Sequence, residues 1–305
     1  MLMATYNAGR YIHDQVNSIL NQTLTPDTLL ITDDCSTDGT IRYLQEVRDS
    51  SPSGTTVHLS VNQHNLGWKE NFRKSLLECS DEFIFFCDQD DVWKNNKIET
   101  YISVFTANPK VNVIVSPFEV IGASDAARDN TMRGGYKCPP PPNSIFDCRV
   151  ESGAGCTIAV RGTYVDKLRP YFAKGLAHDY LFRQAAYFDG SLAVMEDSSI
   201  YRRIHGNNAS EGKRTLESSI ESCKESALLG KMIGNYGFDL KVIEARRLGY
   251  LLTIEYAYSQ RASFLETKKM WRLVSSLFAY PAMYRRLRFL FGDVALAFGI
   301  LRRDD

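Results

Sequence analysis

One strand-like segment of the chain ends in a concentration of carboxylates. Residues 83–87 (Phe-Ile-Phe-Phe-Cys) form a continuous apolar run typical of a buried strand, and Asp88, Asp90 and Asp91 follow within four positions. Grouped carboxylates repel one another unless a cation, hydrogen-bond donors or water offset their charge. Asp88 and Asp90 can converge on one divalent cation, with Gln89 turned away, and hard oxygen ligands favour Mg²⁺ or Mn²⁺. The alternative is a solvated acidic turn or a pair of helix N-caps.

The composition is that of an ordinary globular protein, with 44% hydrophobic and 24% charged residues among 305. The formal net charge is zero, so bulk electrostatics gives no reason to expect a nucleic-acid partner. Seven scattered cysteines without a CxxC pair argue against a disulfide framework or a zinc site and favour a reducing cytosol. We find neither a signal-peptide pattern nor an apolar stretch of membrane-spanning length, and we therefore expect a cytoplasmic protein.

Apolar strand-like segments alternate with amphipathic ones through roughly the first ninety residues. Polar side chains collect where each strand ends, which predicts an open α/β sheet with ligands beyond the carboxyl ends of its strands. The chain begins inside its first strand, which suggests that a few residues are missing before it. No GxGxxG motif follows that strand, which argues against a nicotinamide or flavin site. We expect strands at residues 2–4, 29–32, 57–61 and 83–87, and helices at 11–21, 41–48 and ending at Leu77.

The polar clusters at these strand ends have the chemistry of a pyrimidine nucleotide-diphosphate site. An aromatic ring can stack on a base, a carboxylate can accept from a uracil- or thymine-type imide N–H, and a metal pair can hold a diphosphate. Each cluster alone is weak evidence for such a site, but polar clusters at the ends of successive predicted strands together favour it. The clusters are Thr5-Tyr6-Asn7, Asp33-Asp34, residues 65–71 and Asp88-Gln89-Asp90.

These segments resemble the family-2 glycosyltransferases of the GT-A fold, most closely the rhamnosyltransferase-like branch that builds bacterial surface polysaccharides. The resemblance covers roughly residues 1–210 and implies an α/β GT-A domain with a mostly parallel central sheet. Residues 211–305 follow with a helical pattern, so we expect a C-terminal α-helical extension there. The resemblance rests on Ala4-Thr5-Tyr6-Asn7, residues 18–23, residues 33–40, Asn65-Leu66-Gly67 and residues 87–93, in matching order and spacing.

The resemblance implies a donor site and a metal site. Thr5, Tyr6 and Asp34 would hold the nucleotide base, with Asp33 and Asn65 in support. Asp88 and Asp90 would bind Mg²⁺ or Mn²⁺, and Asp90 is the stronger candidate for direct coordination. The full set expected for the nucleotide sugar is Thr5, Tyr6, Asn7, Asp33, Asp34, Asn65, Asn71, Asp88 and Arg203.

His178-Asp179 matches the family's His-Asp pair at the start of a helix and nominates Asp179 as the general base. An acceptor hydroxyl is a poor nucleophile until a base takes its proton, and a helix N-terminus keeps a carboxylate ionised. The alternative is that Asp179 only caps a helix over residues 180–187. Acceptor-binding residues are expected at Trp93, Gly155, Cys156 and His178, although Trp93 suits equally well a half-buried anchor for the following helix.

Residues 203–208 resemble the family's closing Arg-x-His-x-x-Asn segment, with Tyr201 one position further back than in the familiar pattern. His205 could ligate the metal or donate to the diphosphate, and Arg203 could neutralise developing negative charge.

The resulting hypothesis is an inverting, metal-assisted glycosyltransferase. It would move L-rhamnose from dTDP-rhamnose, or a hexose from a UDP-sugar, to a hydroxyl of a glycan or lipid-linked glycan. A nucleotidyltransferase would carry a Gly-rich basic loop after the first strand, and residues 5–10 match that pattern poorly. A catalytically silent binding module is the other rival, and the presence of Asp179 and of the Asp88–Asp90 pair argues against it.

The C-terminal region suggests a further contact. Basic residues beside large apolar ones at helical spacing suit a helix lying on an anionic membrane surface, on the inner face of the cytoplasmic membrane. The alternatives are a helical hairpin packed on the body or a homodimer contact. The residues are Lys268, Lys269, Arg272, Arg285, Arg286, Arg288, Arg302 and Arg303, among Trp271, Leu273, Phe278, Tyr284, Phe289 and Phe291.

Overall fold

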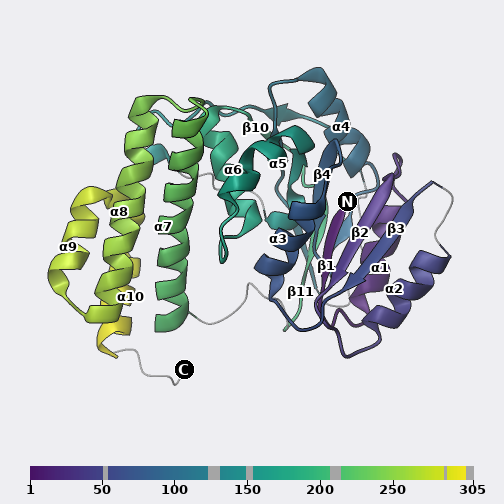
Figure 1. The fold of residues 1–305 in the computed structure, drawn as a ribbon, viewed down its shortest axis with the longest axis horizontal. Coiled ribbons are helices and arrows are strands. Elements are labelled where there is room, and N and C mark those ends of the chain that lie inside the picture. Colours follow the sequence, from purple (N-terminus) through teal and green to yellow (C-terminus); the bar gives the residue numbers. More distant parts are fainter. Residues whose placement is uncertain (51–53, 123–130, 149–153, 207–213, 285–286, 300–305) are drawn as a thin grey trace.

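The computed structural model describes residues 1–50, 54–122, 131–148, 154–206, 214–284 and 287–299. Its centre is an eight-stranded sheet of order β3-β2-β1-β4-β9-β6-β10-β8 (Figure 1). The first four strands in this order are parallel and β6 is parallel to β10, whereas β9 and β8 pair antiparallel with their neighbours. The strands are β1 (Leu2–Thr5), β2 (Thr28–Asp33), β3 (Thr56–Val61), β4 (Phe83–Cys87), β6 (Val113–Val115), β8 (Tyr136–Lys137), β9 (Ala159–Arg161) and β10 (Leu192–Met195).

Helices cover both faces of this sheet, so the predicted open α/β architecture is confirmed. Successive side chains of a strand point to opposite faces. Met3 and Phe85 therefore enter the core under α1, α2 and α4, whereas Leu2 and Phe86 enter the core under α3, α5 and α6. The helices are α1 (Tyr11–Leu20), α2 (Thr40–Asp49), α3 (Trp68–Glu78), α4 (Lys97–Ala107), α5 (Gly162–Leu168) and α6 (His178–Asp189).

The strands and helices predicted for the first ninety residues lie within one or two residues of their predicted bounds. In α1 the apolar residues Ile12, Val16 and Ile19 form the buried stripe that the sequence indicates. A second, three-stranded sheet of order β5-β11-β7 pairs Val92 and Trp93 with residues 200–201, which brings the segment after the acidic motif beside a distant strand. These strands are β5 (Val92–Trp93), β7 (Glu119–Gly122) and β11 (Ile200–Ile204).

The predicted helical character of the C-terminal region is confirmed, and in Figure 1 α7 stands beside α6, with α8 on the other side of α7. Ile233 and Tyr236 of α7 belong to the same hydrophobic core as Phe182 of α6. The Tyr236 hydroxyl donates to Asp189 at 2.8 Å, so α7 is packed firmly on the sheet domain. Residues 207–213, at the proposed domain boundary, lie outside the described residues. The C-terminal elements are α7 (Leu216–Asp239), α8 (Ala245–Thr267), α9 (Met270–Ala279) and α10 (Leu287–Phe298), with short 3₁₀ turns η1 (Ile145–Asp147), η2 (Gly155–Thr157), η3 (Arg169–Tyr171) and η4 (Pro281–Tyr284).

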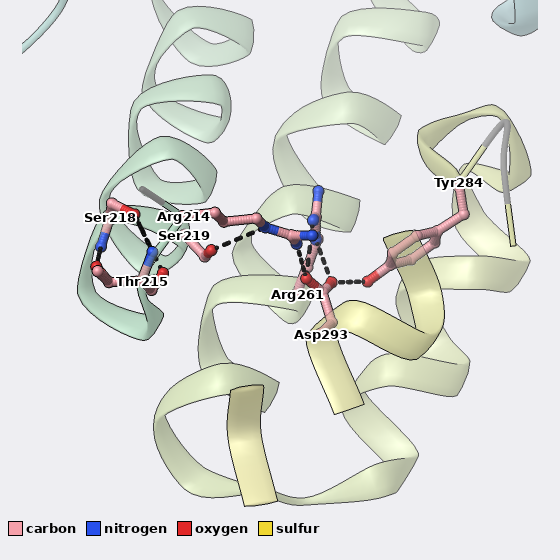
Figure 2. Close-up of polar contacts among 7 residues, drawn as sticks. All are labelled: Arg214, Thr215, Ser218, Ser219, Arg261, Tyr284 and Asp293. Atoms are coloured by element: carbon pink, nitrogen blue, oxygen red, sulfur yellow. Dashed lines mark hydrogen bonds and ion pairs between the residues drawn. The ribbon is translucent and has the colours of Figure 1, made fainter. Parts of the chain in front are cut away.

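A buried carboxylate ties α10 to the other C-terminal helices. Asp293 is fully buried and accepts hydrogen bonds from Arg214, Arg261 and Tyr284, which come from three other segments (Figure 2). Thr215 caps α7 by accepting from the Ser218 backbone N–H, and it lies next to this cluster. Within the described part of the chain, none of the helices combines the length and the apolarity that crossing a bilayer requires.

Candidate active site

A cavity of about 1680 Å³ begins at the carboxyl ends of β1, β2 and β4 and continues along α6 to the C-terminal helices. Parallel neighbouring strands end at the same edge of the sheet, and this is why polar residues far apart in sequence meet here. The predicted residues that line the cavity are Thr5, Tyr6, Asp34, Asn65, Asn71, Asp88, Asp90, Gly155, His178 and Asp179.

Asp34 organises the end of the cavity beyond β2. Its carboxylate accepts hydrogen bonds from the backbone N–H groups of Leu66 and Gly67, each at 2.8 Å, and from the Asn62 amide at 2.9 Å. Asn65 accepts from the Gly67 N–H at 3.0 Å, and Gly67 has a φ of 80°, a conformation that favours glycine. These bonds hold the 62–67 loop against the strand end.

The expected donor residues divide into those that face the cavity and those that support it. The Tyr6 ring is 46% exposed and available for stacking. Asn71 is buried and bonds to the Thr32 carbonyl and to Asn62, so its side chain is already engaged. Asp33 is buried and accepts from Thr5 and Ser36. The Asn7 backbone N–H donates to the Ser36 hydroxyl, and its side-chain oxygen accepts from the Thr37 N–H. Both side chains fix loops and neither lines the cavity, so a contact of either with the nucleotide stays a prediction.

The carboxylates of Asp88 and Asp91 meet after β4, whereas the Asp90 carboxylate lies against His205. Asp88 and Asp91 bring carboxylate oxygens, together with the Cys156 sulfur, within 4.8 Å of one another. Burial raises the pKa of Asp88 above its usual range, and repulsion from Asp91 and Asp90 adds to this effect. Burial and repulsion from Asp90 also raise the pKa of Asp91. One oxygen of Asp91, Oδ2, is buried without a hydrogen-bond partner among the described residues. Ionising these carboxylates together is therefore unfavourable unless a positive group offsets their charge.

The donor set fits a hard divalent cation. The structure brings the oxygens of Asp88 and Asp91 together, while Asp90 also lines the cavity. Carboxylate oxygens are the ligand type that Mg²⁺ and Mn²⁺ prefer, and Asp91 Oδ2 has no hydrogen-bond partner among the described residues. Cys156 lies beside them, but burial and the two carboxylates raise the pKa of its thiol well above the usual value. A neutral thiol is a poor ligand for these hard ions, so Cys156 is buried support for the carboxylates. This corrects its expected acceptor-binding role.

Two residues clamp the acidic motif in place. The Gln89 side chain turns to Tyr6, accepting from its N–H at 2.6 Å and donating to its carbonyl at 3.1 Å. The ring Nε2 of His205 lies 2.8 Å from the Asp90 carboxylate, and the ring stacks on Tyr11. His205 is therefore close enough to orient Asp90, and its direct ligation of a metal stays a prediction.

Asp179 lies in the first turn of α6, one residue after buried His178. The residue at the N-cap position is Ala177, so the alternative in which Asp179 caps the helix is wrong. One of its oxygens, Oδ1, has no hydrogen-bond partner among the described residues. Gly155 lies against it: a Cβ added there would stand 3.4 Å from the Asp179 Cβ. Asp179 thus lines the cavity and has one carboxylate oxygen that no described group engages.

The structure contradicts two expectations. Trp93 is fully buried, with the Lys97 ammonium 3.5 Å from its ring centroid, so it is a core residue and offers no platform for an acceptor. Arg203 is 3% exposed and bonds to Asp14 and to the carbonyls of Asp90 and Gly122. It braces the acidic motif from behind, whereas its neighbour Arg202 lines the cavity.

Several cavity residues escaped the sequence analysis. Arg183, one helical turn after Asp179, could have been found from its i, i+4 spacing. Asp91 belongs to the same acidic run as Asp88, and only the fold shows which carboxylates converge. No local sequence pattern predicts the far wall of the cavity, because this wall is formed by helices that pack there only in the folded chain. Its residues include Arg214, Ser218, Ser222, Tyr258, Arg261 and Tyr280.

Comparison with solved structures gives the same fold. The crystal structure of S. aureus TarS residues 1–349 matches with a TM-score of 0.60 and 17% identity, covering 98% of this chain and 90% of that one. The complex of the same protein with UDP-GlcNAc matches with a TM-score of 0.58 and 16% identity, over the same shares of both chains. These matches identify the GT-A fold that the sequence predicts.

Comparison with known sequences points to one family. The dTDP-rhamnosyl transferase RfbG of Shigella flexneri is 31% identical over 218 residues, which are 68% of this chain and 72% of the relative. An uncharacterized glycosyltransferase of Nostoc sp., alr2836, is 24% identical over 95% of this chain and 93% of its own length. Residues 1–166 match the family described as glycosyl transferase family 2. The chain therefore belongs to glycosyl transferase family 2 and is a glycosyltransferase.

Proposed function

We propose that this glycosyltransferase inverts the configuration of a sugar as it moves it from a nucleotide-sugar donor to a hydroxyl of a glycan or lipid-linked glycan. The observation that carries this proposal is the placement of Asp179. Its carboxylate shares one cavity with the nucleotide-type clusters at the strand ends, and one oxygen has no structural partner among the described residues.

The donor proposed first is dTDP-rhamnose, and a UDP-hexose is second. Support for this order comes from the 31% identical relative named a dTDP-rhamnosyl transferase. A relative named as a UDP-Glc-dependent glucosyltransferase acting on a diphosphoundecaprenol-linked acceptor, WfgD of Escherichia coli, is 30% identical over a smaller part, 46%, of this chain. The exposed Tyr6 ring can stack on either pyrimidine base, and Asp34 can accept from the imide N–H that thymine and uracil share.

Asp88 and Asp90 are proposed to hold Mg²⁺ or Mn²⁺, with Asp91 beside them. The bound cation would supply Lewis-acid stabilisation of the nucleoside diphosphate as it leaves. Arg202, which lines the cavity, adds a fixed positive charge near this end.

The protein's own part in the reaction is to position the acceptor and remove its proton. Asp179 would take the proton from the acceptor hydroxyl as that oxygen attacks the anomeric carbon from the face opposite the nucleotide. Gly155 leaves space for the acceptor beside this carboxylate, because a Cβ at this position would already be in van der Waals contact with Asp179. The attack forms one C–O bond and breaks another, so no covalent enzyme intermediate is needed.

The test is a donor screen followed by turnover. Purified protein is incubated with Mg²⁺ or Mn²⁺ and a panel of dTDP-, UDP- and GDP-sugars, and its melting temperature and release of nucleoside diphosphate are measured. A donor that binds the folded state raises the melting temperature. We expect metal-dependent stabilisation by one nucleotide class, and turnover at least a hundredfold lower in Asp179→Asn.

The matched control is Asp166→Asn, which neutralises a carboxylate that is 66% exposed and forms a surface ion pair with Arg169. This variant should keep both binding and turnover. Stabilisation by a nucleotide sugar without any turnover would favour a silent binding module. A folded protein that responds to none of the donors would contradict the donor site at Asp34 and Asp88.

Cytoplasmic location stays a proposal, supported by the free state of all seven cysteines.

A further inference from the structure

The exposed side chains of α9 (Met270–Ala279) are all apolar. Met270, Trp271, Val274 and Phe278 are 48%, 57%, 44% and 84% exposed. At about 100° per residue these four positions fall on one face of the helix, while Leu273 and Ser276 are buried on the other side. Surface helices normally place polar residues toward water, so α9 presents the reverse of the usual pattern.

The sequence around this helix is basic. Between Glu266 and Asp293 the chain contains six Lys and Arg residues and no acidic residue. The two acidic residues that bound the segment are engaged, since Glu266 pairs with Lys224 and Asp293 is buried among its arginines. Lys268 and Lys269 are exposed directly before α9.

Arg272 packs against Trp271, with its guanidinium 4.4 Å from the ring centroid, and donates a hydrogen bond to Gln260 of α8. Of the other expected membrane residues, Arg285, Arg286, Arg302 and Arg303 and the side chains of Arg288 and Phe289 lie outside the described residues, so the inference rests on α9 and its flanking lysines.

We propose that α9 lies on an anionic lipid bilayer, with Trp271, Val274 and Phe278 in the interface and Lys268 and Lys269 over the lipid headgroups. Amphipathic helices bind such surfaces through buried apolar area together with attraction between Lys or Arg and anionic lipids. Tryptophan and lysine are also residue types that favour the boundary between headgroups and acyl chains. A second copy of the chain is a poorer occupant, because pairing two copies of this face would bring like charges together.

The position of α9 gives the contact a consequence for the cavity. Tyr280, which follows the last residue of α9, and Met283 of η4 both line the cavity that contains Asp179. A helix held at a bilayer would therefore bring one wall of this cavity close to membrane-bound molecules. The inference concerns a separate surface, and it holds whether or not Asp179 is the base.

The test is co-sedimentation of the full-length protein with vesicles. Vesicles of phosphatidylglycerol and phosphatidylcholine are compared with vesicles of phosphatidylcholine alone, at low salt and at roughly 0.3 M salt. We expect binding to the anionic vesicles, weak binding to the neutral ones, and a clear loss at high salt. Lys268→Gln combined with Lys269→Gln should weaken binding about thirtyfold at low salt, and Phe278→Ser about tenfold.

The matched control is Phe238→Ser. Phe238 is 73% exposed on α7 and is followed by Asp239. It therefore presents the same exposed aromatic ring as Phe278, but beside an acidic residue and not in a purely basic segment. This variant should bind vesicles like the natural sequence. Unchanged melting temperature and unchanged donor-induced stabilisation would show that each variant is folded.

Three outcomes would overturn the proposal. One is a failure to bind anionic vesicles; another is equal weakening by Phe238→Ser and Phe278→Ser. The third is a dimer in sedimentation velocity that Phe278→Ser converts to monomer, which would assign the face to a second copy.

Discussion

Asp293 offers a sharp test of how the C-terminal helices are held. Arg261 donates two hydrogen bonds to its carboxylate, at 2.7 and 3.1 Å, while Arg214 and Tyr284 donate one each. Burial lowers the pKa of Arg261, but the hydrogen bond to Asp293 and neighbouring negative charge more than compensate and raise it above its ordinary value. Asp293→Asn keeps the volume of the side chain, so the change isolates the electrostatic contribution.

The magnitude follows from the bonds that asparagine cannot make. Its single carbonyl oxygen keeps about two of the four bonds, and its amide group faces donors. Hydrogen bonds to a charged group contribute roughly 1.5–3 kcal/mol each, and removing one partner of a buried ion pair costs roughly 3–5 kcal/mol. Arg214 is 38% exposed, so water offsets part of its loss. We therefore expect a loss of about 3 kcal/mol, near the lower end of that range.

The assay combines urea unfolding, followed by circular dichroism, with hydrogen exchange of α10. Exchange is needed because α10 can detach while the sheet domain stays folded, and the loss then shows as local opening. Asp166→Asn is the control, since an exposed ion pair should change the free energy of unfolding by less than about 0.5 kcal/mol. A loss below about 1 kcal/mol with unchanged exchange in α10 would refute the account of a buried, charge-dependent anchor.

Three further changes test the site itself. Gly155→Ala should lower kcat without changing the melting temperature or the donor KM, because the added Cβ would stand 3.4 Å from the Asp179 Cβ. Steady-state kinetics measures this effect, and an unchanged kcat would mean that the acceptor has room to shift. Burial lowers the pKa of His178 to about 4, so below its ordinary pKa of about 6.5 the unfolded chain takes up a proton that the folded chain refuses. Stability should fall by about 2 kcal/mol between pH 7.5 and pH 5, and His178→Phe should remove that component; equal pH slopes in urea unfolding would count against it. In Asp34→Asn, either the Leu66 or the Gly67 N–H loses its hydrogen-bond acceptor. We expect nucleotide binding to weaken at least tenfold in a thermal-shift titration, and unaltered binding would contradict this prediction.

Local patterns predicted the secondary structure well because each pattern has one physical cause. The stripe Ile12, Val16 and Ile19 lies on one face of a helix, and the short apolar run at residues 83–87 has the length and the aromatic content typical of a buried strand. The site residues that face the cavity come from the ends of such strands, so their gathering could also be predicted. Tyr6, Asp34 and Asp88 are of this kind.

Side-chain direction was harder to predict. The aromatic ring of Trp93 is of a type that can stack on sugars, yet the pairing of β5 with β11 places the ring in the core. Arg202 and Arg203 are neighbours on β11, and adjacent strand residues point to opposite faces, so only the register decides which one reaches the cavity. The sequence motif could not distinguish them.

The sequence by itself determined the order of strands and helices, the acidic motif and the family, because these depend on residue type and spacing along the chain. Tertiary structure alone decided that Asp91 joins Asp88, that Asp33 and Asn7 support loops, and that C-terminal helices close one side of the cavity. Each of these depends on contacts between residues far apart in sequence. The physical reason is that burial and charge pairing are properties of the packed chain, fixed only when distant segments meet.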